Sequence, residues 1–197
     1  MNPVQNKQDK KRALDIMAKA FIGSTGMTWM LKRNNKANLR IFLSFFFHEV
    51  SVKNGAWLTS DRNGVVFFYQ LQNHKQSVLN IFRKLYVFVF IMGFTKGIKA
   101  MRCKTTVDKI RPKTGWFGWL VATDDTAIGN AAAYEIKNEM FRLADESNEP
   151  IYVETTVKRV MILYKASGYY EYAKIKHPYQ ADLTIWFMKR DPHTFNK

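Results

Sequence analysis

The side chains that most often carry out chemistry are scattered along this 197-residue chain. Neither its single Cys103 nor its four histidines show the Cys-x-x-Cys or His-x-x-x-His spacing of a zinc site (His48, His74, His177 and His193). It has no Gly-x-Ser-x-Gly elbow of a serine hydrolase. Gly23-Ser24-Thr25-Gly26 lacks the Lys-Ser/Thr pair of a phosphate-binding P-loop and indicates the end of a helix. The sequence therefore predicts no metal site, no serine hydrolase and no P-loop enzyme.

The composition is that of a folded globular protein. Hydrophobic residues make up 47% of the chain, which argues against intrinsic disorder, and the length fits a single domain over residues 1–197. The most apolar stretches, 41–47 and 85–94, are shorter than the roughly 18–20 residues that span a bilayer. With one cysteine and no apolar signal-peptide stretch after the basic amino terminus, we expect a cytoplasmic protein without a membrane span.

Positive charge is in excess, with 31 Lys and Arg against 16 Asp and Glu, for a net charge of +15. It is concentrated in residues 95–113, where seven basic residues accompany Asp108 alone. This segment is either a solvated basic face or a docking surface for nucleic acid, an anionic membrane or a small anionic cofactor. Because neither an RNP-type motif nor a helix-turn-helix is recognisable, a nucleic-acid partner is not favoured.

Hydrophobic spacing predicts two helices, then a hairpin, in the first third of the chain. The helices are expected from Asp9 to just before Gly23 and from Lys36 to Val50. Strands are expected at 56–60 and 65–71, because an Asn-Gly pair, Asn63-Gly64, lies between two runs of β-forming residues. A long helical region should follow from Ser77 to Ile110, with a break near Gly93 or Gly97.

The second half of the chain alternates between strands and helices. Strands are expected at 116–123, 151–156 and 181–190, with a possible short strand at YYEYAKI, and helices at 126–147 and 157–168. Gly168 should close the second helix at its C′ position. This order predicts an α/β or α+β fold with one central mixed sheet flanked by helices.

From Gly115 to Tyr172 the chain has a strand, an alanine-rich helix, the strand PIYVETT and the Tyr-x-x-x-Gly-Tyr sequence from Tyr164 to Tyr169, in that order. These motifs and their order resemble the GNAT superfamily of N-acyltransferases. The resemblance implies a GNAT-like sheet with a helical insert before the fourth strand, and a fourth and fifth strand that separate to admit acetyl-CoA as acyl donor.

The resemblance also implies a pyrophosphate-binding loop after the fourth strand, whose backbone N–H groups bind the anion at a helix start. The family pattern Gln/Arg-x-x-Gly-x-Gly/Ala is altered here, because Asp124 begins the loop and Ala127 replaces a glycine. Two readings stay open, in which the loop binds CoA or the aspartates only cap the next helix. The expected donor-binding residues are backbone groups of the strand and the loop: Leu120, Val121, Ala122, Asp125, Thr126, Ala127, Ile128, Gly129 and Asn130.

Two catalytic residues follow from the same resemblance. Tyr164 would protonate the leaving thiolate, since a phenol is protonated at neutral pH; alternatively, it is a packed aromatic residue of a short helix. Glu154 is the first candidate for the general base that takes a proton from the acceptor amine, although a strand Glu often only faces solvent.

The implied function is transfer of an acetyl group from acetyl-CoA to a primary amine by direct attack in a ternary complex. The partners would be an acyl-CoA and an amine-bearing small molecule or peptide, and like charge argues against cationic acceptors such as polyamines. The alternatives are an inactive GNAT fold that binds or senses a ligand and, less favoured, a basic nucleic-acid-binding module. The acceptor and the oligomeric state are not readable from the sequence.

Overall fold

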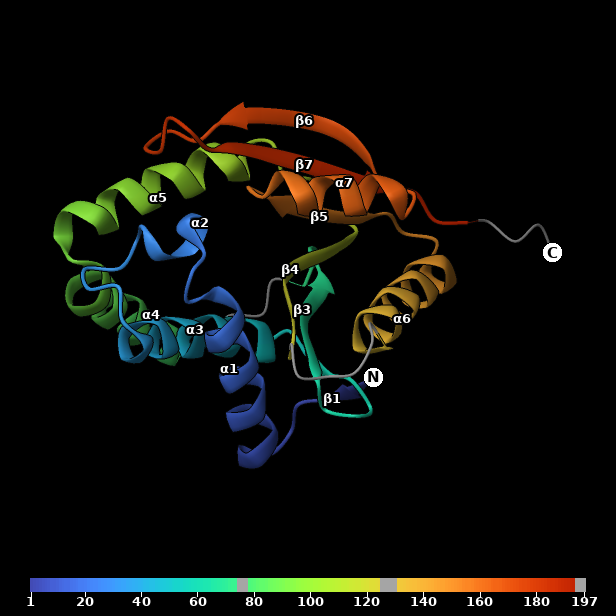
Figure 1. Cartoon of the computed structure of the whole chain (residues 1–197), viewed down its shortest axis with the longest axis horizontal. Helices are drawn as coiled ribbons and strands as arrows, with labels where there is room; N and C mark the ends of the chain where they lie inside the picture. The colour runs from blue at the N-terminus through green and yellow to red at the C-terminus, as the bar shows by residue number, and fades with distance from the viewer. Residues whose placement is uncertain (74–77, 125–130, 194–197) are drawn as a thin grey trace.

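The computed structural model describes residues 1–73, 78–124 and 131–193, with side chains omitted for 78–81. Its centre is one mixed seven-stranded sheet in the order β1-β2-β3-β4-β5-β7-β6 (Figure 1). The strands are β1 (Asn2–Pro3), β2 (Ala56–Leu58), β3 (Gly64–Gln70), β4 (Trp116–Thr123), β5 (Ile151–Thr155), β6 (Tyr170–Lys176) and β7 (Thr184–Arg190). Neighbouring strands are antiparallel except β4 and β5, which are parallel. The expected mixed sheet is confirmed.

Helices cover both faces of this sheet. The described helical segments are α1 (Lys7–Phe21), α2 (Thr25–Thr28), α3 (Lys36–Ser51), α4 (Val78–Tyr86), the π-helix η1 (Val87–Met92), α5 (Phe94–Asp108), α6 (Ala131–Ser147) and α7 (Lys158–Ala166). Apolar side chains of α1, α3 and α5 pack on one face of the sheet, and those of α6 and α7 pack on the other. Side chains alternate between these two cores along β5, where Tyr152 joins the first core and Ile151 and Val153 join the second.

The insert between β3 and β4 is helical, as expected, and its break is at Gly93. This residue has φ +75°, a conformation that glycine adopts without steric cost, and α5 begins directly after it. Gly97, the other candidate, lies buried inside α5. The turn lets η1 lie against α3 while α5 extends to the far sheet strands, β6 and β7 (Figure 1).

The YYEYAKI segment forms β6, an edge strand that pairs with β7 over most of its length, which confirms the strand expected there. Two other elements differ from the sequence-based expectation. The amino-terminal residues add β1 beside β2, and the segment after Gly23 forms the short helix α2 instead of only ending a helix. Within the described ranges no helix is long and apolar enough to cross a membrane, and no cluster of His, Cys, Asp and Glu could hold a metal ion.

Candidate functional site

The central feature of the candidate site is the place where β4 and β5 separate. The two strands pair in parallel over three residue pairs only, the last of which is Gly118 with Val153. Beyond it β4 continues to Thr123 along β3, while β5 continues to Thr155 along β7. The sheet therefore opens between its two middle strands, as the resemblance implied.

A bulge in β4 lies at the start of this opening. Phe67 of β3 pairs with Leu120 whereas Phe68 pairs with Gly118, so Trp119 is the extra residue on β4. Its half-buried ring packs against Phe46 of α3, with ring centroids 4.6 Å apart. The bulge thus places an aromatic side chain on the α1 and α3 face, directly beyond the last β4–β5 pair.

The hydrogen bonds of β4 determine which backbone groups face the opening. Asp124 N donates to Asn63 O at 2.7 Å, and hydrogen-bonded pairs alternate along an antiparallel ladder. The N–H groups of Ala122 and Leu120 therefore face β3, and that of Val121 faces the opening. Of the three strand residues expected from the sequence to bind the donor, Val121 is the one whose N–H faces the opening.

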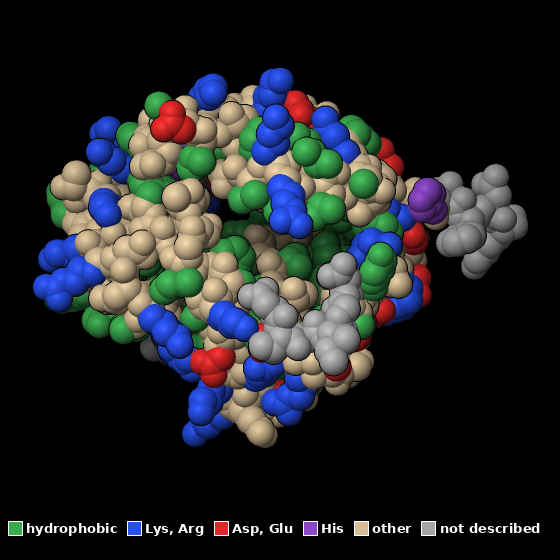
Figure 2. All heavy atoms as spheres, viewed as in Figure 1, with side chains coloured by type: hydrophobic (Ala, Val, Ile, Leu, Met, Phe, Trp, Pro, Cys, Tyr) green, Lys and Arg blue, Asp and Glu red, His purple; other side chains and the backbone are tan. Residues whose placement is uncertain are grey.

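The molecular surface is hollowed at the same place. Figure 2 shows a central hollow with hydrophobic side chains at its floor, between α7 and β5 above and α1 below, and with Lys and Arg side chains around its rim. An apolar floor with a cationic rim suits a ligand that has an uncharged chain and a phosphate end.

The described part of the expected pyrophosphate loop ends at Asp124, whose carboxylate is paired with two cations of α1. Arg12 lies 3.1 Å from Asp124 Oδ2, and Lys19 donates to Oδ1 at 2.8 Å. The two positive charges exceed the single negative charge of Asp124. The start of the loop therefore does not repel an anion. The other loop residues of the prediction lie outside the described residues: Asp125, Thr126, Ala127, Ile128, Gly129 and Asn130.

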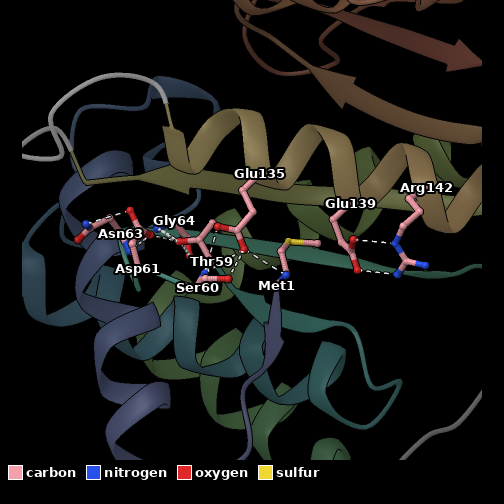
Figure 3. Close-up of polar contacts among 9 residues, drawn as sticks. All are labelled: Met1, Thr59, Ser60, Asp61, Asn63, Gly64, Glu135, Glu139 and Arg142. Carbon is pink, nitrogen blue, oxygen red and sulfur yellow. Dashed lines mark hydrogen bonds and ion pairs between the residues drawn. The ribbon is translucent and has the colours of Figure 1, made fainter.

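A polar network holds α6, the helix after this loop, against the β2–β3 turn (Figure 3). Glu135 accepts hydrogen bonds from the backbone N–H and hydroxyl of Ser60, at 2.9 and 2.8 Å, and pairs with the amino group of Met1 at 3.1 Å. Burial alone would raise the pKa of the Glu135 carboxyl, but the contacts with Ser60 and Met1 together lower it. The first turns of α6 are thereby fixed beside the end of β4.

Tyr164 lies on α7, on the α6 side of the sheet, among apolar side chains. Burial raises the pKa of its phenol to about 12, so the hydroxyl keeps its proton at neutral pH and can donate it. Tyr164 also takes part in the closure of α7: Tyr169 N donates to Tyr164 O at 3.0 Å, and Gly168 N donates to Lys165 O at 3.1 Å. These bonds form a Schellman motif, with Gly168 at φ +90° and the two tyrosine rings 5.2 Å apart.

This motif gives the Tyr-x-x-x-Gly-Tyr pattern a structural reason. A Schellman motif favours a glycine at C′, here Gly168, and an apolar contact across the helix end. A phenylalanine at position 164 would make that contact as well as a tyrosine does. The hydroxyl of Tyr164 is the one feature that helix closure leaves unexplained.

Glu154 lies near the end of β5, and both of its carboxylate oxygens are engaged by Arg111. Arg111 Nε donates to Oε1 at 2.7 Å and Nη2 to Oε2 at 2.9 Å, with both side chains less than one fifth exposed. The guanidinium also stacks on the ring of Phe117, 4.4 Å from its centroid, and pairs with Asp108. Burial alone would lower the pKa of Arg111, but the bonds and charge of Glu154, with that of Asp108, outweigh it and raise this pKa.

The structure places the two expected catalytic residues on opposite faces of the sheet. Tyr164 belongs to the core under α6 and α7, whereas Glu154 turns with Tyr152 to the face of α5 and Arg111. Arg111 was included in the basic segment by its charge, and its pairing with Glu154 was not predicted. The bulge at Trp119 was not predicted either, because no local sequence pattern indicates it.

Comparison with known proteins gives matches in structure only. No family model matches the chain, and no curated protein matches its sequence. One similar solved structure is a histone acetyltransferase HPA2 and related acetyltransferase from Corynebacterium glutamicum, with a TM-score of 0.67 and 19% identity over the whole of both chains. Another is a putative arylalkylamine N-acetyltransferase 7 from the yellow fever mosquito, with a TM-score of 0.58 and 10% identity over 95% of this chain and 85% of that one.

A third similar structure is the C-terminal condensation domain of Ebony in complex with beta-alanyl-dopamine. Its TM-score is 0.62, with 10% identity over 95% of this chain and 96% of that one. At these identities the likeness concerns the fold. Together with the opening between β4 and β5, it establishes that this chain has the fold of the GNAT acetyltransferases.

Proposed function

We propose that the protein is an N-acetyltransferase that uses acetyl-CoA to acetylate a primary amine by direct attack in a ternary complex. The observation that carries this proposal is the separation of β4 from β5 after Gly118 in a chain with the GNAT fold. The hollow in Figure 2 lies at this separation, and its cationic rim suits the phosphates of the donor.

The donor side of the reaction is assigned to β4 and α7. The N–H of Val121 on the open edge of β4 donates to the oxygen that becomes negative when the amine attacks the acyl carbon. As the carbon–sulfur bond breaks, the Tyr164 hydroxyl gives its proton to the thiolate. The loop from Asp125 to Asn130 and the start of α6 are the proposed site for the pyrophosphate, and Arg12 and Lys19, which contact Asp124 just before the loop, supply positive charge.

The acceptor side is assigned to the opposite face. Arg111 uses two of the roughly four lone-pair positions of the Glu154 carboxylate, which leaves the others for the incoming ammonium group. The two bonds from the guanidinium fix the orientation of this carboxylate. Glu154 therefore holds the ammonium, and the proton passes through it to water before the amine attacks.

Aromatic side chains on that face suggest the acceptor class. Trp119 packs against Phe46, and its ring centroid is 6.5 Å from that of Tyr69. Such surroundings favour an amine attached to an apolar or aromatic group. The mosquito structure of similar fold is an arylalkylamine N-acetyltransferase, so arylalkylamines are the first acceptors to test.

The test is a screen of primary amines for release of free thiol from acetyl-CoA, followed by the Tyr164→Phe variant. We expect kcat to fall about 100-fold or more, because the variant keeps the packing of α7 and loses only the proton donor. Tyr169→Phe is the matched control, since Tyr169 is buried, its ring contacts that of Tyr164 and it lies in the same motif. Equal rates for wild type and Tyr164→Phe would contradict the assignment.

A ligand-binding protein without catalysis is the second candidate, because the Schellman motif explains Tyr164 apart from its hydroxyl. It predicts saturable binding of acetyl-CoA and no thiol release with any amine.

A further inference from the structure

The helical insert exposes an apolar surface that neither the fold nor the proposed reaction uses. Five side chains of α4 and η1 are between 42% and 69% exposed, at spacings of three and four residues that place them on one helix face: Phe82, Leu85, Tyr86, Val89 and Phe90. We call these five residues the insert face. Phe94, at the start of α5, extends the apolar surface and is 70% exposed.

The opposite side of the same helical segment packs into the hydrophobic core. Val87 and Ile91 are 5% and 3% exposed and join the core formed by α1, α3 and the sheet. Lys32 N donates to Ile91 O at 2.8 Å, which fixes η1 further. The insert face therefore does not stabilise the fold, and a contiguous exposed apolar surface of this kind is typical of a docking site.

The charge of the chain segment that carries the insert face indicates what docks there. Residues 82–113 contain nine Lys or Arg and one acidic residue, Asp108. Arg102, Lys104 and Lys109 are exposed on and after α5, and Figure 2 shows Lys and Arg side chains on the surface over that helix. A second copy of this chain would bring like charges together at a net charge of +15 per copy.

An anionic bilayer satisfies both features. Lys and Arg side chains close to an anionic membrane are attracted to its surface. A helix with aromatic residues on one side and basic residues nearby lies in the plane of the bilayer interface. We propose that the insert face docks the protein on an anionic lipid bilayer, with the aromatic side chains of α4 and η1 at the boundary of headgroups and acyl chains.

The test is flotation of the purified full-length protein with vesicles of phosphatidylcholine alone and of phosphatidylcholine mixed with phosphatidylglycerol. We expect binding to the mixed vesicles, weaker binding to phosphatidylcholine alone, and a decrease as salt is raised. Phe90→Asp should lower the partition coefficient about tenfold or more, because a charge replaces an aromatic side chain that would enter the bilayer.

Tyr134→Asp, on α6, is the matched control, since Tyr134 is 60% exposed and Phe90 is 64% exposed. It should leave vesicle binding within about twofold of wild type. Three outcomes would overturn the proposal: no binding to the mixed vesicles, an equal loss with Tyr134→Asp, or a dimer in solution that Phe90→Asp dissociates while vesicle binding is unchanged.

Discussion

Two Arg–carboxylate pairs in this molecule have the same chemistry and different locations. Arg190 of β7 donates from both Nη atoms to Asp145 of α6, at 2.8 and 3.0 Å, and stacks on Phe141. Arg111 donates to both oxygens of Glu154 and stacks on Phe117. Each pair is bidentate, and each guanidinium lies over a phenylalanine ring.

The surroundings distinguish them. The first pair joins a helix to the sheet strand beneath it, and the side chains of Arg190 and Asp145 are 4% and 15% exposed. The second lies near the end of β5, beyond the last β5 pair with β4, and its two side chains are 18% and 17% exposed. An ion pair that solvent can reach at an opening can also be reached by a substrate. We therefore call Arg190–Asp145 the scaffold pair and Arg111–Glu154, our proposed acceptor contact, the site pair.

The largest effect on stability is expected at the scaffold pair. Asp145→Asn leaves the buried Arg190 charge without its counter-ion, so the free energy of unfolding should fall by about 3 kcal/mol. Acetyl transfer per folded molecule should change little. Chemical denaturation measures the first quantity and thiol release the second. A loss of less than about 1 kcal/mol would show that this pair is not a stabilising contact.

Acid should remove the same contribution from the wild type. Burial would raise the pKa of the Asp145 carboxyl, but hydrogen bonds from Arg190 and His193 N–H, with the charge of Arg190, lower it below its ordinary value of 3.8. The stabilisation is thus complete above the unfolded pKa and is lost as pH falls through the lower folded value. The stability difference between wild type and Asp145→Asn should shrink below about pH 4. Chemical denaturation of both proteins at a series of pH values measures this difference. A difference that stays constant down to pH 2 would contradict the prediction.

At the site pair we expect a small effect on stability and a larger effect on activity. Glu154→Gln should cost about 1 kcal/mol of stability, because Arg111 keeps its contact with Asp108 and both side chains are partly exposed. It should lower kcat/KM for the amine about tenfold or more, because the ammonium loses its anionic partner. If Glu154→Gln and Asp145→Asn lowered activity equally at equal folded fraction, the distinction between the pairs would be lost.

The smallest effect is expected at a third, surface arginine. Arg142 of α6 pairs with Glu139 and Glu146, as Figure 3 shows for Glu139, and its side chain is 50% exposed. Replacement by alanine should change the free energy of unfolding by about 0.5 kcal/mol or less, since solvent screens the pair. A larger loss of unfolding free energy would mean that the exposed fraction of an arginine does not predict how much its ion pair stabilises the protein.

Local sequence signals predicted the elements that local chemistry determines. The Asn63-Gly64 turn fixed the β2–β3 hairpin, the run Trp116–Thr123 is a strand throughout, and Gly93 ends the first part of the insert. The Arg111–Glu154 pair could not be predicted, because its residues are 43 positions apart and meet only when α5 crosses to the end of β5. The bulge at Trp119 likewise depends on the register of β3 and β4.

The candidate site was predictable where a local motif marks it and not where residues distant in the sequence meet. A family-like motif places Tyr164 on a helix next to β5, but the same motif closes that helix, so sequence cannot separate packing from catalysis. The charge of Asp124 suggested repulsion of a phosphate, and only the fold brings Arg12 and Lys19 from α1 to its carboxylate.

Calorimetric titration of the wild-type protein with acetyl-CoA, at low and moderate salt and with ADP as anion control, tests the central claim most directly. The account predicts saturable 1:1 binding at micromolar concentration that persists at moderate salt, because backbone groups and the β4–β5 opening hold the donor. Absence of binding, or binding that ADP reproduces and salt abolishes, would contradict a donor site in this opening.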